Sequence, residues 1–217
     1  MKDQQIKSAP MPTVRRLPSY LRFLKLLQAK NREYVSCTHI AAELGLDPTQ
    51  IRKDLSSAGA HGTPKIGYQV DTLIAAIEGF LGWDDPTYAF LVGANGVAES
   101  LMENPYMQQR CGLDVLAVFD TDTDRVGEEI AGKEILAVDK LPDLAHRMHV
   151  HIGILAVPGP QAQDMANTLI ASGVKAIWNF THERIDVPED VTIENLDIAA
   201  SMAALSAKRA VAELVKS

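Results

Sequence analysis

The sequence of 217 residues has few of the features that mark secreted, membrane or metal-binding proteins. Its two cysteines, Cys37 and Cys111, are too few for a disulfide framework and lie in no zinc-site spacing. No apolar run is long enough to cross a bilayer, and residues 1–12 lack the apolar stretch of a secretory signal. We therefore expect a cytoplasmic globular protein, which 47% hydrophobic and 23% charged residues also suit.

The charge is distributed unevenly along the chain. The net charge of −7 by itself argues against a nucleic-acid partner. Residues 1–68, however, carry 11 Lys and Arg against 5 Asp and Glu, whereas residues 69–217 carry 10 against 23. A basic head on an acidic body is expected where only one part of a protein meets a polyanion. The distribution therefore favours a DNA-binding N-terminal segment.

The N-terminal third has the spacing of a winged helix-turn-helix. Leu17, Leu21 and Leu24 recur at helical intervals, which predicts a helix over 18–30 with Pro18 in its first turn. Further helices are expected over 39–44, 48–57 and 71–81, and the second of these has Asp47 as N-cap. Three glycines and one proline over 59–68 predict a wing.

The helix over 48–57 carries the residue types that read DNA. Arginine pairs with guanine, glutamine with adenine, and lysine with phosphate. This helix follows a glycine-containing turn, as the recognition helix of a helix-turn-helix does. The DNA-binding residues that we expect are Arg15, Arg16, Gln50, Arg52, Lys53 and Lys65.

Beyond a polar turn at 82–87 the pattern changes to strands that alternate with helices. The expected strands are 88–92, 114–119, 135–138, 152–157, 174–180 and 191–196. Alternation of this kind predicts an α/β fold with a Rossmann-type parallel sheet. We therefore expect a DNA-binding domain over 1–82, a nucleotide-binding domain over 86–197 and a C-terminal helix over 198–217 that reaches a partner subunit.

A glycine-containing turn between the first strand and its helix suits a dinucleotide. Gly93 and Ala98 fit the first and third places of the G-x-G-x-x-G/A pattern, but Asn95 occupies the second. A side chain there hinders close approach of the pyrophosphate. Asp120 ends the second strand, where an acid binds a ribose hydroxyl. The cofactor-binding residues that we expect are Gly93, Ala94, Asn95, Gly96, Val97, Ala98, Asp120, Val157, Pro158 and Phe180.

Several segments along the chain form a set of recognisable motifs. They are residues 13–18 and 20–22, Gln50 to Ser56, residues 67–70, Phe119-Asp120, residues 173–175, Asn179-Phe180, residues 187–191 and residues 194–197. Together these motifs resemble the Rex family of redox-sensing transcriptional repressors. The resemblance implies a homodimer with swapped C-terminal helices that binds a pseudo-palindromic operator and leaves it when NADH binds. It also implies a salt bridge between subunits, from Arg22 to Asp197, that changes with the bound state.

Other functions stay open at this stage. Asn95 and Thr181-His182 depart from the family pattern, which favours as alternatives a ligand such as coenzyme A or a repressor that has lost NADH sensing. A dehydrogenase would need a proton-transfer residue, and His182 is the one candidate. Because the basic head has no role in a dehydrogenase, we expect no enzyme activity. His146, His149 and His151 straddle a loop and a strand start, and we expect no metal there.

Overall fold

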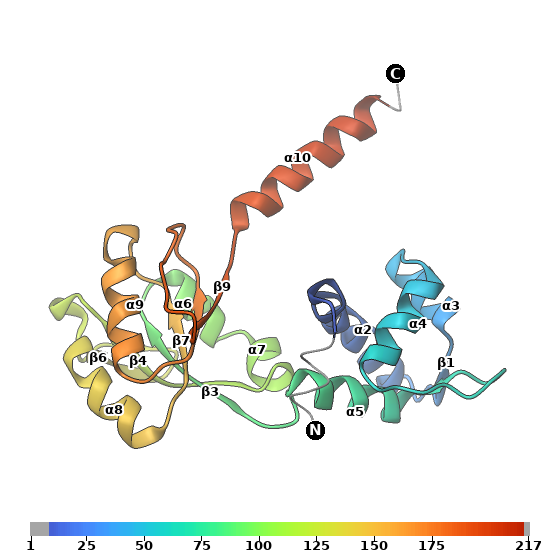
Figure 1. The fold of residues 1–217 in the computed structure, drawn as a ribbon, viewed down its shortest axis with the longest axis horizontal. Helices are drawn as coiled ribbons and strands as arrows, with labels where there is room; N and C mark the ends of the chain where they lie inside the picture. The colour runs from blue at the N-terminus through green and yellow to red at the C-terminus, as the bar shows by residue number, and fades with distance from the viewer. Residues whose placement is uncertain (1–8, 215–217) are drawn as a thin grey trace. The chain divides into compact units, whose positions relative to one another are not determined.

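The computed structural model describes residues 9–214, except for the side chains of 109, 110, 212 and 214. The chain divides into two compact units, and the division falls between Pro86 and Thr87 (Figure 1). Within the described residues, the helices are too short or too polar to cross a membrane.

The first unit is helical with one small sheet. Its elements are α2 (Met11–Ala29), β1 (Tyr34–Val35), α3 (Cys37–Leu44), α4 (Pro48–Ser57), β2 (Tyr68–Gln69) and α5 (Val70–Leu81). The bounds predicted for α4 are confirmed, because Asp47 accepts hydrogen bonds from the backbone N–H groups of Thr49 and Gln50, and Pro48 starts the helix. The left-handed Gly45 ends α3, as the glycine at that position predicts.

The prediction that the first helix begins at Pro18 is wrong. Helix α2 begins at Met11, with Pro12 in its first turn, and Pro18 lies inside it. An internal proline removes one helical hydrogen bond and usually costs about 3 kcal/mol. The turn before Pro18 is stabilised by tertiary contacts: Leu17 is fully buried, and Thr13 donates a hydrogen bond to Asp54 of α4. These contacts outweigh the preference of proline for the first turn of a helix.

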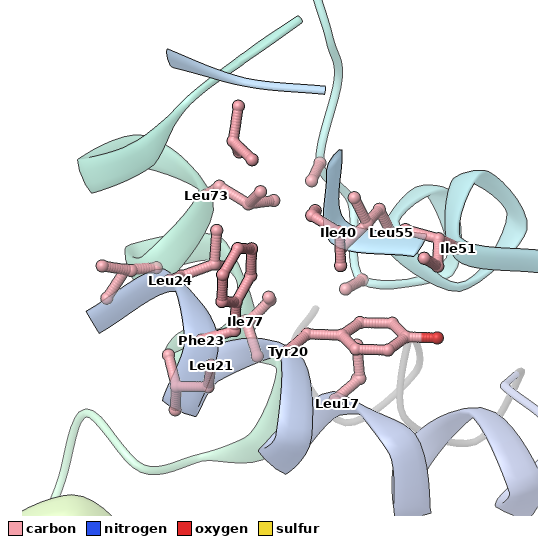
Figure 2. Packing of buried hydrophobic residues seen from close by; sticks show 14 of the residues in the cluster. Leu17, Tyr20, Leu21, Phe23, Leu24, Ile40, Ile51, Leu55, Leu73 and Ile77 are labelled. Carbon is pink, nitrogen blue, oxygen red and sulfur yellow. The ribbon is translucent and has the colours of Figure 1, made fainter. Parts of the chain in front are cut away.

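One apolar cluster holds the first unit together. Figure 2 shows Leu17, Tyr20, Leu21 and Leu24 of α2 packed with Ile40 of α3, Ile51 and Leu55 of α4, and Leu73 and Ile77 of α5. All of these are buried, and the Tyr20 hydroxyl lies at the edge of the group. Since α4 buries Ile51 and Leu55 one turn apart, its opposite face must point to solvent.

The predicted wing is a loop that closes on the small sheet. Strands β1 and β2 pair antiparallel, and Thr63 bridges to Gly67 within the loop. Gly67 has a φ of 105°, and a Cβ there would lie 2.4 Å from the Val35 carbonyl oxygen. Only glycine therefore fits where the wing meets β1.

The second unit is a seven-stranded sheet with helices on both faces. Its elements are β3 (Thr87–Val92), α6 (Gly96–Met102), α7 (Pro105–Arg110), β4 (Leu113–Asp120), β5 (Glu129–Ile130), β6 (Lys133–Ala137), α8 (Leu141–Met148), β7 (Ile152–Leu155), α9 (Ala162–Ala171), β8 (Ala176–Asn179), β9 (Thr192–Asn195) and α10 (Ile198–Leu214). The strand order is β5-β6-β4-β3-β7-β8-β9, and all pairs are parallel except β5 with β6. This is the expected Rossmann-type order.

Alternation along β3 shows how the sheet is covered. Phe90 and Val92 pack with α8 and α9, whereas Ala89 and Leu91 pack with α6 on the other face (Figure 1). The sequence-based prediction did not include α7 and α8. It also missed β5, a two-residue edge strand. Since β3 lies between β4 and β7, the chain reverses its direction of winding at this strand.

Helix α10 exposes an apolar stripe. Ile198, Met202 and Leu205 recur at helical spacing, and their side chains are 56%, 60% and 61% exposed. Exposed apolar stripes of this kind mark surfaces that pack against another protein.

Candidate nucleic-acid interface and nucleotide cleft

The exposed face of α4 presents a compact set of polar side chains. Thr49, Arg52, Lys53 and Ser56 are all exposed. Their spacing of three, four and seven residues places them on one face of the helix. The prediction named Arg52 and Lys53 but missed Thr49 and Ser56. The apolar positions Ile51 and Leu55 carry the signal for the whole face, because they fix which side of the helix is buried.

Arg52 and Lys65 line the same cleft, although 12 residues, the last of α4 and the first of the wing loop, separate them. The cleft has a volume of about 430 Å³ and runs between α4 and the wing, with Tyr68 on its wall. Lys65 is exposed and has a φ of 66°. Two cations on one open cleft form an arrangement suited to a polyanion.

A buried carboxylate joins α2 to α4. Asp54 is fully buried and accepts hydrogen bonds from four side chains. These are Thr13 Oγ1 at 2.9 Å, Arg16 Nε at 2.7 Å and Nη2 at 2.8 Å, the Tyr20 hydroxyl at 2.6 Å and Gln50 Nε2 at 2.9 Å. The sequence-based prediction missed this cluster. The sequence does contain one signal for the cluster: Asp54 is a charged residue within the apolar stripe of Ile51, Leu55 and Ala58.

The cluster keeps Asp54 ionised. Burial by itself raises the pKa of Asp54, but hydrogen bonds from Arg16, Tyr20, Thr13 and Gln50 outweigh it and hold the pKa at about 2. Burial and the hydrogen bond to Asp54 raise the pKa of Tyr20. Of the predicted DNA-binding residues, Arg16 and Gln50 are thus bound to Asp54, while Arg15 is exposed on α2.

The second unit has a cleft at the carboxyl ends of its central strands. The cleft has a volume of about 440 Å³. Five of the predicted cofactor residues line it, namely Gly93, Ala94, Asn95, Asp120 and Pro158. Gly96 and Val97 lie exposed at the start of α6, Ala98 and Val157 are buried in the core, and Phe180 packs against Trp178.

Two residues give this cleft features of a dinucleotide site, one in the turn and one at a strand end. Gly93 has a φ of 104°, and a Cβ there would lie 2.5 Å from the backbone of Ala156. Asp120 lies at the end of β4, and its carboxylate accepts hydrogen bonds from the N–H groups of Ala94 at 2.8 Å and Asp122 at 2.9 Å. An acid held at this point of a Rossmann sheet fits a ribose hydroxyl.

Asn95 occupies the place where a pyrophosphate would meet α6. Its Oδ1 accepts hydrogen bonds from the N–H groups of Val97 at 3.0 Å and Ala98 at 3.2 Å, and its Nδ2 donates to the Ala156 carbonyl. Asn95 is therefore the N-cap of α6. A pyrophosphate fits these amides only after the Asn95 side chain moves away.

The cleft also contains residues that the sequence pattern did not predict. Arg125 donates to the Ala94 carbonyl and lies 3.8 Å from Asp120. Thr121 and Gln161 hydrogen-bond at 2.8 Å, which joins the segments that follow β4 and β7. Arg125 and Gln161 lie in single 3-10 turns and Thr121 lies in a bend, and segments this short give no periodic signal.

The two residues expected to form a switch between subunits occupy separate elements. Arg22 is exposed on α2. Asp197 is exposed just before α10, and its Oδ1 accepts a hydrogen bond of 2.8 Å from the N–H of Ala200. Asp197 therefore caps α10, a role that the sequence pattern did not indicate.

Comparison with known proteins finds two family models and close relatives. Residues 8–56 match the N-terminus of putative DNA-binding proteins, and residues 84–183 match a CoA binding domain. The chain is 42% identical over 205 residues to the redox-sensing transcriptional repressor Rex of Treponema denticola, covering 94% of this chain and 96% of that protein. It is 41% identical to the Rex of Bacteroides fragilis, covering 90% and 89%.

Solved structures with the same fold extend the likeness to bound states. The structure of RSP in complex with beta-NAD+ and operator DNA has a TM-score of 0.86 and 30% identity, and the match covers 96% of this chain and 95% of that chain. RSP in complex with beta-NADH also has a TM-score of 0.86, at 29% identity, with 96% and 98% covered.

Proposed function

This chain belongs to the Rex family of redox-sensing transcriptional repressors, and we propose on that basis that it binds operator DNA and senses NAD(H). In this proposal, the first unit binds the operator and the cleft of the second unit takes the dinucleotide. Binding of NADH then releases the DNA. The observation that supports the proposal most strongly is the fold match to RSP, whose complex contains both beta-NAD+ and operator DNA.

The residues of each unit suit these roles. Arg52 and Lys53 on the exposed face of α4, with Lys65 on the wing, would contact the bases and phosphates of the major groove. Asp120 would bind a ribose hydroxyl, and Gly93, where a Cβ would meet the backbone of Ala156, would form the tight turn that leads into α6. The oxidation state of the nicotinamide is the signal that the protein would sense.

A homodimer connects the two roles. The apolar stripe of α10 would pack against a second copy of the chain, and Arg22 and Asp197 would form the bridge between subunits. Two recognition helices must meet half-sites about one turn of DNA apart. A ligand that changes the relation between the subunits would therefore change operator affinity.

The test of this function uses a DNA duplex that the wild-type protein binds preferentially. The wild-type chain selects a duplex from a randomised pool, and a scrambled duplex of equal composition serves as the control. NADH is expected to release the selected duplex at concentrations where NAD has little effect. Thermal shifts with NADH, NAD, NADP and coenzyme A identify the ligand. A shift with coenzyme A alone would contradict redox sensing and favour the ligand class that the second family model names.

Replacing Arg52 with alanine is expected to weaken binding of the selected duplex about 10- to 100-fold, because a bidentate arginine–guanine pair contributes about 1–3 kcal/mol of discrimination. NADH affinity should be unchanged. Fluorescence anisotropy measures the first quantity and calorimetry the second. Lys30→Ala, which removes an exposed cation at the end of α2, is the matched control. Equal effects of the two substitutions would show that Arg52 contributes only general charge.

Replacing Asn95 with glycine is expected to tighten NADH binding roughly twofold, because the asparagine cap competes with the pyrophosphate and stabilises the helix start by only a few tenths of a kcal/mol more than glycine does. Calorimetric titration with NADH measures the change. Asn104→Gly is the matched control, since Asn104 caps α7 through the N–H of Tyr106 in the same way, outside the residues that line the cleft. Weaker NADH binding by Asn95→Gly would instead mean that the Asn95 amide contacts the dinucleotide.

A further inference from the structure

The cluster around Asp54 determines which side chains of the first unit are available to DNA. Both carboxylate oxygens are shared among donors, with Thr13, Arg16 and Gln50 on Oδ1, and Arg16 and Tyr20 on Oδ2. Three of these donors belong to α2, whereas Gln50 and Asp54 itself belong to α4. The cluster thus fixes the orientation of α4 on α2 by polar contacts, in addition to the apolar core.

We propose that Asp54 is a positioning residue for DNA recognition, which orients α4 and withdraws Arg16 and Gln50 from the DNA-contacting set. The bases are then read from the face formed by Thr49, Arg52, Lys53 and Ser56. The inference rests on the proposed DNA-binding function. It replaces our sequence-based expectation that Arg16 and Gln50 contact DNA directly.

The geometry at Arg16 neutralises its charge. The guanidinium meets the carboxylate in a two-pronged arrangement, with Nε to Oδ2 at 2.7 Å and Nη2 to Oδ1 at 2.8 Å. Asp54 is fully buried, so water does not compete for this pair from the carboxylate side. A cation paired in this way releases few counterions when DNA binds, because the carboxylate already serves as its counterion.

A hydrogen bond within α4 holds the Gln50 amide against the helix. Its Nε2 donates to Asp54 Oδ1, one turn further along α4, and the residue is half-buried. Gln50 and Asp54 therefore form a stripe between the buried residues Ile51 and Leu55 and the exposed face. That face carries two cations of its own, at positions 52 and 53, and both side chains are exposed to solvent.

The first test uses the salt dependence of binding to the scrambled duplex. Lys53→Gln is expected to reduce the slope of log affinity against log salt by about 0.9 for each phosphate that the lysine neutralises. Arg16→Gln is expected to leave the slope unchanged, because the charge that it removes is already paired. An equal decrease for both variants would overturn the proposal.

The second test compares the selected duplex with the scrambled duplex. Asp54→Asn keeps the shape of the side chain but removes its charge, and it is expected to lower the preference for the selected duplex at least tenfold. Affinity for the scrambled duplex should change less than threefold, since phosphate contacts dominate it. If Asp54→Asn lost the same factor of affinity for both duplexes, or lost affinity for neither, the positioning role would be contradicted.

A third variant keeps the proposal testable if Asp54→Asn does not fold. Gln50→Ala is expected to lower the preference for the selected duplex less than threefold, whereas Arg52→Ala lowers it at least tenfold. Equal losses would show that Gln50 reads a base, against the proposal. If the wild-type chain selects no sequence from the pool, the proposed function itself fails, and that outcome is distinct from all of these.

Discussion

Replacing Leu205 with glutamate in α10 is expected to convert the protein to a monomer and to weaken binding of the selected duplex about 100-fold or more. Leu205 is the last residue of the exposed apolar stripe, one turn after Met202, and it is 61% exposed. A carboxylate there would have to lose its hydration in the apolar interface of the proposed dimer, which is costly. Two half-sites bound by one linked pair of subunits gain 10²- to 10⁴-fold over single binding, and the monomer loses this gain.

Sedimentation measures the oligomeric state of Leu205→Glu. Fluorescence anisotropy with the selected duplex measures its affinity for DNA. Lys208→Glu is the control, because it also places a carboxylate on an exposed position of α10, changes the net charge by two units instead of one, and preserves helix-forming residues. The monomer should still bind NADH, since the cleft residues all lie before α10. A dimer that persists in Leu205→Glu would show that another surface joins the subunits.

The sequence predicts an element well where local signals agree with packing. Helix α4 has an N-cap, a proline at its first position and an apolar stripe, and its predicted bounds are confirmed. Helix α2 shows the opposite case. Pro18 suggested a beginning, but the turn before it is held by the bond from Thr13 to Asp54, 41 residues further along the chain, which no local pattern contains.

The candidate sites divide in the same way. The positions of Arg52 and Gly93 follow from helix spacing and from a turn motif, so the sequence locates them. The partner of Arg16 and one partner of Asn95 do not, because Asp54 and Ala156 lie 38 and 61 residues away. The other partners of Asn95, the N–H groups of Val97 and Ala98, are local. Residue type alone predicted a DNA contact for Arg16 and an obstruction at Asn95. The structure adds a buried ion pair and a helix cap.

Replacing Asp54 with alanine is expected to destabilise the first unit by about 3 kcal/mol, because it leaves the buried hydroxyls of Tyr20 and Thr13 without their acceptor. Arg16 is half-buried, so its guanidinium can turn toward solvent when Asp54 is removed. The loss of stability therefore lies at the lower end of the range of about 3–5 kcal/mol for breaking a buried ion pair. Asp47→Ala is the matched control. It removes an exposed carboxylate that caps the same helix, at a cost of about 1 kcal/mol.

The measurement can be confined to the first unit. Trp83 packs against its core, whereas Trp178 belongs to the second unit, so urea unfolding is followed by fluorescence in a Trp178→Phe background. A loss of about 1 kcal/mol or less, no more than a single neutral hydrogen bond contributes, would mean that the apolar core alone holds α4 on α2.

Acid should remove the same contribution from the wild-type chain. The pKa of Asp54 is about 2 in the folded protein, below the value of about 3.9 for an unfolded aspartate. A depressed pKa contributes stability that is complete above the unfolded value and is lost as the pH falls through the folded value. The difference between wild type and Asp54→Ala should therefore shrink by roughly 2 kcal/mol as the pH falls from about 6 to about 2. A difference that stays constant over this range would place the effect in packing, because only the ionised carboxylate can hold Arg16.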